Sequence, residues 1–131
     1  MSNYIATDPI ADLLARLRNA QAVSHEQLTV PHSQAKMHIL KLLKAGGFVT
    51  DFSTSKDNPG MIKIELSESV RPMLELKRLS KPGRRLYVRA GKIPISHGGR
   101  GLIVVSTSQG MMSGNDARKR RLGGELICEV Y

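Results

Sequence analysis

The chain lacks several features that would assign a small protein to a common class. Cys128 is the only cysteine, which excludes a disulfide framework and a cysteine-based zinc site. Tryptophan is absent and aromatic residues make up 4% of the chain, so we expect a mostly aliphatic core. No stretch approaches the roughly 18 consecutive apolar residues of a membrane span, and residues 1–11 contain no apolar run of signal-peptide length. We therefore expect a soluble, intracellular protein that does not enter a membrane.

Acidic residues are scarce, and one long stretch contains none. Lys and Arg total 20 against 11 Asp and Glu, a formal net charge of +9. No carboxylate occurs between Leu76 and Asn115, and a second basic cluster, residues 118–121, follows closely. A solvated basic face is the ordinary explanation of a charge run, but such a long acid-free stretch favours a surface that binds a polyanion, either nucleic acid or an anionic membrane surface. Its basic residues are Lys77, Arg78, Lys81, Arg84, Arg85, Arg89, Lys92 and Arg100.

The first part of the chain alternates helical and strand patterns. A helix is predicted from Pro9, capped by Asp8, because apolar residues then recur through Leu17 at the spacing of one buried face. A strand over 27–30 and a second helix, capped by Ser33 and ending at residues 46–47, come next. Strands over 48–54 and 61–66, with a turn between them, complete the order helix, strand, helix, strand, strand.

The second part is predicted to be mostly β-structure. Strands are expected over 84–89, 101–106 and 125–131, with a turn at 80–83 and a loop rich in Gly and Pro at 91–101. Ser113 is expected to cap a short helix that runs to Arg120 and is ended by Gly123-Gly124. Residues 70–77 fit either a linker or a strand. The patterns together predict an α+β protein with two lobes, residues 1–68 and 69–131.

Motifs for catalysis or metal binding are incomplete. The residue two positions before Ser108 is Ser106, so Gly-x-Ser-x-Gly is not formed, and no glycine completes a phosphate-loop or dinucleotide pattern. The four histidines are dispersed, without carboxylates at ligand-like spacing. We therefore predict no enzyme, no metal site, no cofactor and no small-molecule substrate. The histidines are His25, His32, His38 and His97.

Two neutral features accompany the basic stretch. Residues 106–110 (Ser-Thr-Ser-Gln-Gly) follow a predicted buried strand directly, and their hydroxyl and amide groups suit base edges, 2′-hydroxyls and phosphates. The same residues are also ordinary turn formers. Tyr87 lies between two arginines, where an exposed ring could stack on a base, although its spacing fits a partly buried position equally well. Lys81, Arg84 and Arg85 are the predicted phosphate contacts beside it.

Four segments in order resemble one known family. They are Asp8–Asn19 (DPIADLLARLRN), Ser80–Val88 (SKPGRRLYV), Gly101–Gly110 (GLIVVSTSQG) and Gly123–Cys128 (GGELIC). With them the chain is similar, essentially end to end, to the bacterial small-subunit ribosomal protein S-eight family. The resemblance implies an α/β N-terminal lobe packed against a mainly β C-terminal lobe. It also implies a primary binder of the central domain of small-subunit ribosomal RNA, located in the cytoplasmic small ribosomal subunit beside other ribosomal proteins.

The resemblance further implies which residues bind RNA. Ser106, Thr107, Ser108 and Gly110 correspond to the principal RNA-reading loop, and Tyr87 corresponds to an aromatic contact. Glu125 matches a carboxylate that braces the loop by hydrogen bonds. The matching secondary contacts in the N-terminal lobe are Asp8, Arg16, Asn19, Ser33 and Lys36.

Two departures from the family limit what the resemblance implies. Many members have Lys after Ser-Thr-Ser where this chain has Gln109, so no phosphate contact is carried over to that position. The family's Met-Thr-Asp-Arg is replaced by Met-Ser-Gly-Asn at 112–115, so no contact of that Asp or Arg is carried over either. A free nucleic-acid-binding regulator is an alternative class, because the same basic surface would serve it. The location of the protein distinguishes the two classes: a ribosomal protein is found on small subunits, and a free regulator in a soluble pool.

Overall fold

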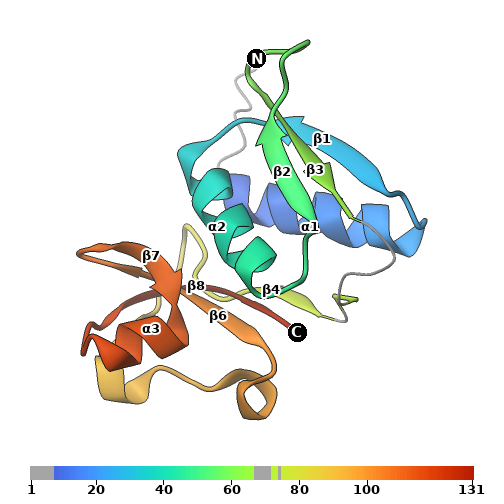
Figure 1. The fold of residues 1–131 in the computed structure, drawn as a ribbon. Coiled ribbons are helices and arrows are strands. Elements are labelled where there is room, and N and C mark those ends of the chain that lie inside the picture. The colour runs from blue at the N-terminus through green and yellow to red at the C-terminus, as the bar shows by residue number, and fades with distance from the viewer. Residues whose placement is uncertain (1–7, 67–71, 74) are drawn as a thin grey trace. The chain divides into compact units, whose positions relative to one another are not determined.

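The computed structural model describes residues 8–66, 72–73 and 75–131. The chain divides into two compact units, Met1–Met73 and Leu74–Tyr131, and the expected boundary between residues 68 and 69 lies outside the described residues. Helices and antiparallel sheets occur together, with more helix in the first unit and mainly strands in the second (Figure 1). The predicted α+β class is thereby confirmed.

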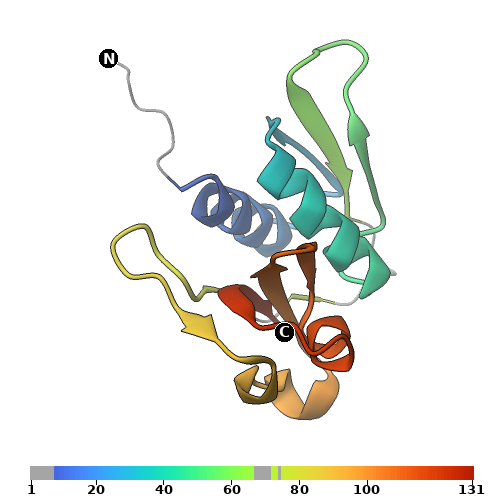
Figure 2. The same ribbon diagram turned by 90° about the vertical axis from the view of Figure 1, so that its left-hand side faces the viewer.

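The N-terminal unit has helices on one face of a three-stranded antiparallel sheet. The sheet has the strand order β1-β3-β2, and both helices lie on the same side of it in the two views (Figures 1 and 2). The predicted order of elements is confirmed in this unit. Its elements are α1 (Pro9–Ala22), β1 (Gln27–Pro31), α2 (Gln34–Ala45), β2 (Asp51–Thr54) and β3 (Met61–Glu65).

Capping and apolar spacing explain where α1 and α2 lie. The Asp8 carboxylate accepts a hydrogen bond from the Ala11 N–H at 3.1 Å, and the Ser33 hydroxyl accepts one from the Lys36 N–H at 3.4 Å. The apolar face predicted for α1 is buried, and it meets buried side chains of α2 and of the strands. The aliphatic side chains that are almost fully buried in this unit are Leu13, Leu14, Leu17, Val30, Ile39, Leu40, Leu43, Ile62 and Ile64.

The C-terminal unit is organised around its last strand. Strand β8 pairs with β6 on one side, with β4 and β5 at different places on the other, and β7 extends the sheet beyond β6. Residues 91–101, predicted to be a loop, include parts of two short 3-10 helices. The elements are β4 (Leu76–Arg78), β5 (Tyr87–Val88), η1 (Ala90–Lys92), η2 (Ser96–Gly99), β6 (Leu102–Thr107), β7 (Gly110–Ser113), α3 (Gly114–Lys119) and β8 (Gly124–Val130).

Strand β5 is shorter than the predicted strand over 84–89, and a local turn explains the difference. Lys81 and Arg84 exchange backbone hydrogen bonds at 2.9 Å, which closes a tight turn over residues 82–83. The buried Ser80 hydroxyl accepts a hydrogen bond from the Leu86 N–H at 2.8 Å. The chain therefore remains in the turn until Leu86 and pairs with β8 as a strand only at Tyr87 and Val88.

One face of the C-terminal sheet packs on α3 and on Ile93, the residue after η1, through an aliphatic core. Val105 of β6, Met112 of β7 and Leu126 of β8 are neighbours across the strands and meet Ala117 of α3. Burial of each of the Val, Met and Leu side chains contributes about 1.5–3 kcal/mol relative to solvent exposure. The opposite face of the same strands is polar where β6 ends and β8 begins. The core cluster consists of Ile93, Ile103, Val105, Met112, Ala117 and Leu126.

Candidate nucleic-acid interface

Strand pairing brings together residues that are distant in sequence. Glu125 of β8 pairs with Ser106 of β6 on one side and with Tyr87 of β5 on the other, and Ser106 also pairs with Met111 of β7. Residues directly opposite each other in an antiparallel sheet point to the same face. Met111, Ser106, Glu125 and Tyr87 therefore form a row across four strands, here called the cross-strand row. Tyr87 is 69% exposed, which resolves the two alternatives left by its spacing.

A β-bulge sets the alignment of this row. Val104 pairs with Cys128, but the next residue, Val105, pairs with Leu126, so Ile127 is an extra residue in β8. Without it, Leu126 would stand opposite Ser106, because a one-residue shift exchanges the two faces of a strand. The bulge thus places the Glu125 carboxylate on the polar face and Leu126 in the core.

The predicted RNA-reading residues end β6, form a tight turn and begin β7. Thr107 Oγ1 donates a hydrogen bond to the Gly110 carbonyl at 2.8 Å and accepts one from the Gln109 N–H at 3.1 Å. Gly110 adopts a left-handed backbone conformation, with φ of 109°, which would be strained for a residue with a side chain. Ser108 and Gln109 are exposed at the tip. The Thr107 hydroxyl therefore holds the turn, while the Ser108 hydroxyl faces solvent.

Basic side chains lie beside the cross-strand row. Lys81, Arg84 and Arg85 are all exposed on or next to the turn that precedes Tyr87. Arg85 donates from Nη1 to Oε2 of Glu125 at 3.3 Å. Among the residues that the structure describes, this is the contact found for the Glu125 carboxylate, and no hydrogen bond joins it to the turn at 107–110. Glu125 lies next to Ser106 through backbone pairing, and the expected bracing bonds remain a prediction.

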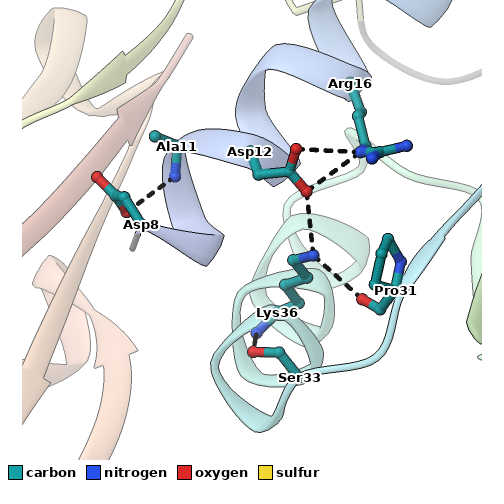
Figure 3. Close-up of polar contacts among 7 residues, drawn as sticks. All are labelled: Asp8, Ala11, Asp12, Arg16, Pro31, Ser33 and Lys36. Carbon is teal, nitrogen blue, oxygen red and sulfur yellow. Dashed lines mark hydrogen bonds and ion pairs between the residues drawn. The ribbon is translucent and has the colours of Figure 1, made fainter. Parts of the chain in front are cut away.

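In the N-terminal unit, several predicted RNA contacts have structural roles (Figure 3). Asp8 and Ser33 are the caps of α1 and α2. Lys36 is 3% exposed, and its ammonium donates to Asp12 Oδ2 at 3.2 Å and to the Pro31 carbonyl at 3.1 Å. The Lys36 ammonium is held inside the fold, because reaching a phosphate would break both of these bonds. The structure thus gives Lys36 a role different from the expected RNA contact.

Asp12 is the shared partner of two cations. Its carboxylate accepts two hydrogen bonds of 3.1 Å from Arg16 Nε in addition to the one from Lys36 (Figure 3). Partial burial opposes ionisation of Asp12, but the bonds from Lys36 and Arg16 outweigh it and hold the pKa of the carboxyl below its ordinary value. The two Nη groups of Arg16 are not used in these bonds and point away from Asp12.

Arg16 and Asn19 remain exposed and share a surface feature. Both line a depression of about 280 Å³ between the C-terminal half of α1 and β1, together with Val23 and His25. Val23 is 61% exposed, which is high for a valine. Of the N-terminal residues predicted to meet RNA, these two are the ones whose polar groups lie on the surface without serving as a helix cap.

Sequence reasoning missed two residues of these sites. Met111 belongs to the cross-strand row, but no strand was predicted there, because Gly110–Ser113 is too short to show alternation. Asp12 joins α1 to Lys36, and its spacing of four residues from Arg16 was the available signal.

Within residues 8–66, 72–73 and 75–131, no three His, Cys, Asp or Glu side chains lie close enough together to hold a metal ion. In the same ranges, no helix has the length and apolar character needed to cross a membrane.

Comparison with known proteins gives the same family that the four sequence segments resemble. The family model of ribosomal protein S8 matches residues 8–131. A protein from Halalkalibacterium halodurans named small ribosomal subunit protein uS8 is 44% identical over 131 residues, which cover 97% of this chain and 99% of that protein. The protein of the same name from Natranaerobius thermophilus is 43% identical over 129 residues, 95% of this chain and 98% of its own. With its fold and these similarities established, the chain belongs to the ribosomal protein S8 family.

Proposed function

We propose that this chain is a structural constituent of the small ribosomal subunit, where it binds the central domain of small-subunit ribosomal RNA and supports folding of that domain during assembly. The ribosomal role is supported by the family and by the names of relatives that align over nearly their whole length. The role is non-catalytic and requires no cofactor. The proposed partners are this RNA and neighbouring small-subunit proteins.

The observation that carries the proposal is the alignment of Tyr87, Glu125 and Ser106 on adjacent strands. An exposed aromatic ring, a row of hydrogen-bonding groups and a hydroxyl-bearing turn at 107–110 suit unstacked bases and 2′-hydroxyls, which is how proteins read RNA. Rigid strands hold these groups at fixed distances, which favours one RNA shape over others. We infer that sequence and shape are recognised at this row.

The basic residues have a separate task in the proposed complex. Lys81 and Arg84 on the turn neutralise phosphates and add affinity that is independent of base sequence. Arg16 and Asn19 are the surface residues of α1 proposed as secondary contacts, together with the caps Asp8 and Ser33. Lys36 is left out of this proposed interface because its ammonium is buried.

Chemical footprinting of the protein on small-subunit RNA tests partner and site together. Protection of a compact region in the central domain is expected, and it should shrink or disappear with a variant carrying Tyr87→Ala and Ser106→Ala. Protection confined to another domain would refute the proposal. Sedimentation of cell extract separates the alternative: stoichiometric presence in small subunits supports a structural role, whereas a mainly soluble pool supports a free regulator.

A further inference from the structure

A second group of basic side chains lies where α3 ends. Of four consecutive basic residues, Arg118 is tied to the fold, because its Nη1 donates to the carbonyls of Ile93 and Pro94, each at 3.2 Å. The other three are exposed, and in the described part of the chain no ion pair or hydrogen bond engages their side chains. These three are Lys119, Arg120 and Arg121.

The fold adds two more exposed cations at this place. Helix η1, which ends at Lys92, packs against α3 (Figures 1 and 2). Just before η1 the backbone lies against Gly123: a Cβ added to that glycine would lie 2.5 Å from the Val88 carbonyl oxygen and 2.9 Å from the Arg89 Cα. The fold thus brings segments distant in sequence together, and their exposed cations are here called the α3 basic surface. It consists of Arg89, Lys92, Lys119, Arg120 and Arg121.

The backbone at Arg121 argues against a purely structural origin of this charge. The Leu122 N–H donates to the Ala117 carbonyl at 2.9 Å and the Arg121 N–H donates to the Arg118 carbonyl at 3.0 Å, the two bonds of a Schellman motif. Arg121 occupies the left-handed position of that motif with φ of 57°, where glycine is the usual residue. Cations near a helix C-terminus are favourable, but Lys119 already supplies one within the last turn. Capping therefore does not require arginine at 121.

The α3 basic surface adjoins the cross-strand row. Gly124 follows Gly123 and lies against β6, where an added Cβ would be 2.1 Å from the Ser106 carbonyl oxygen. The two glycines thus bring Arg89 on one side and Ser106 on the other close to the start of β8. α3 carries one carboxylate, Asp116 in its first turn, and in the described part of the chain no ion pair joins it to Lys119 or Arg120.

We propose that the α3 basic surface binds phosphates of the same RNA that the cross-strand row recognises, and that it does so without reading base sequence. The identity of that RNA rests on the proposed function above. The chemistry rests on the five exposed cations. When they neutralise backbone phosphates, counterions condensed on the RNA are released. The bound RNA then continues from the cross-strand row past Gly123 to the end of α3.

The test is a series of binding titrations at several salt concentrations. Wild type, Arg121→Gly and the double variant Lys119→Gln/Arg120→Gln are each titrated with a central-domain RNA fragment and with an unrelated RNA of equal length. Each lost phosphate contact should flatten the slope of log affinity against log salt by about one unit. It should also lower the affinity for both RNAs by the same factor. Arg121→Gly should also raise the thermal midpoint, because glycine fits the left-handed position. Loss of affinity from a more stable protein cannot be ascribed to unfolding.

The matched control is Lys41→Gln/Lys56→Gln, which removes two exposed charges from the N-terminal unit. It should leave the salt slope as in wild type. Unchanged slopes in both test variants would overturn the proposal, and so would an equal change in the control, since net charge alone would then explain the effect. If the wild type does not prefer the central-domain fragment, the proposed function fails, while slopes with the unrelated RNA still decide whether this surface binds phosphate.

Discussion

Arg85 donates a hydrogen bond from Nη1 to Oε2 of Glu125 across 3.3 Å, and the partners differ in exposure: 53% of the Arg85 side chain is accessible, against 12% of that of Glu125. The carboxylate lies within the cross-strand row, where RNA is proposed to approach. Arg85 therefore offsets a negative charge that would otherwise repel phosphate. Its neighbour Arg84 has no ion pair in the described part of the chain, and so offers a comparison.

Removing these two arginines should have unequal effects on RNA binding. Arg84→Ala should flatten the salt dependence by about one unit of slope, the loss of one phosphate contact. Arg85→Ala should weaken binding more, because it also leaves the Glu125 carboxylate without its partner. Filter-binding titrations over a range of salt concentrations measure both effects. Adding Glu125→Gln to Arg85→Ala should recover the excess loss, and a double variant no better than the single one would contradict this account.

The hydroxyls of Thr107 and Ser108 should separate folding from binding. Thr107→Val loses the bonds to Gln109 and Gly110, so the free energy of unfolding should fall by about 1 kcal/mol. Ser108→Ala loses no bond within the described residues, and its stability should change by less than about 0.5 kcal/mol. Its RNA affinity should nevertheless fall by about 1–3 kcal/mol, the cost of an unpaired polar group in the interface. Urea unfolding and filter binding with the central-domain fragment give the two quantities; unchanged affinity of Ser108→Ala would exclude the turn from recognition.

The Asp12–Lys36 pair should make the stability of the N-terminal unit dependent on pH. Because the folded pKa of Asp12 is lowered, its contribution is present above the unfolded value near 4 and is lost as pH falls through the folded pKa. Asp12→Asn strands the buried Lys36 ammonium and should cost about 3 kcal/mol at pH 7, at the low end for a buried pair because the Asp12 side chain is 30% exposed. Thermal unfolding of wild type and variant from pH 7 to pH 2.5 should show the two curves converging at the acid end.

A double variant provides the control for this pair. Asp12→Asn/Lys36→Met removes the buried charge along with its partner and should recover most of the lost stability. If the double variant is as unstable as Asp12→Asn, the loss comes from the Arg16 contact or from helix α1 rather than from a stranded ammonium.

Cys128 should be inert while the protein is folded. Burial raises the pKa of its thiol to about 12, and the nearby Arg78 lowers it by less, so thiolate is scarce at neutral pH. In buffer at pH 8, iodoacetamide should label the Cys128 thiol only as fast as the chain unfolds. In urea it should label the thiol rapidly. Fast labelling in buffer would mean that β8 separates from the sheet without global unfolding. Mass spectrometry of timed samples distinguishes the two.

Local signals in the sequence predicted the N-terminal unit well. Asp8, Pro9 and the apolar spacing through Leu17 act within one helix, so they specify α1 without the rest of the chain. The short helix capped by Ser113 was predicted for the same reason, and it is present as α3. Its end also follows local rules, except that Arg121 holds a position normally given to glycine.

The arrangement of the candidate site depended on pairing between distant segments. The resemblance named Tyr87, Ser106 and Glu125, but no pattern along the chain shows that Ile127 is an extra residue in β8 that brings Glu125 opposite Ser106. Likewise, the exposure of Tyr87 and the burial of Lys36 follow from tertiary neighbours rather than from local spacing. A lysine in a helix is ordinarily on the surface, and only the nearby Asp12 and Pro31 carbonyl make its burial tolerable.

The central place of β8 has a consequence for when the proposed RNA-binding row can form. Strands β4, β5 and β6 all pair with β8, yet β8 is the last of them to leave the ribosome during synthesis. Pairings between segments so distant in sequence form late and slowly, because a long loop must close first. A nascent chain that stops before residue 124 would have the Ser-Thr-Ser turn but neither Glu125 nor a partner strand for Tyr87. The cross-strand row that is proposed to bind RNA therefore forms only when synthesis passes β8, so that shorter nascent chains would not compete for RNA through this row.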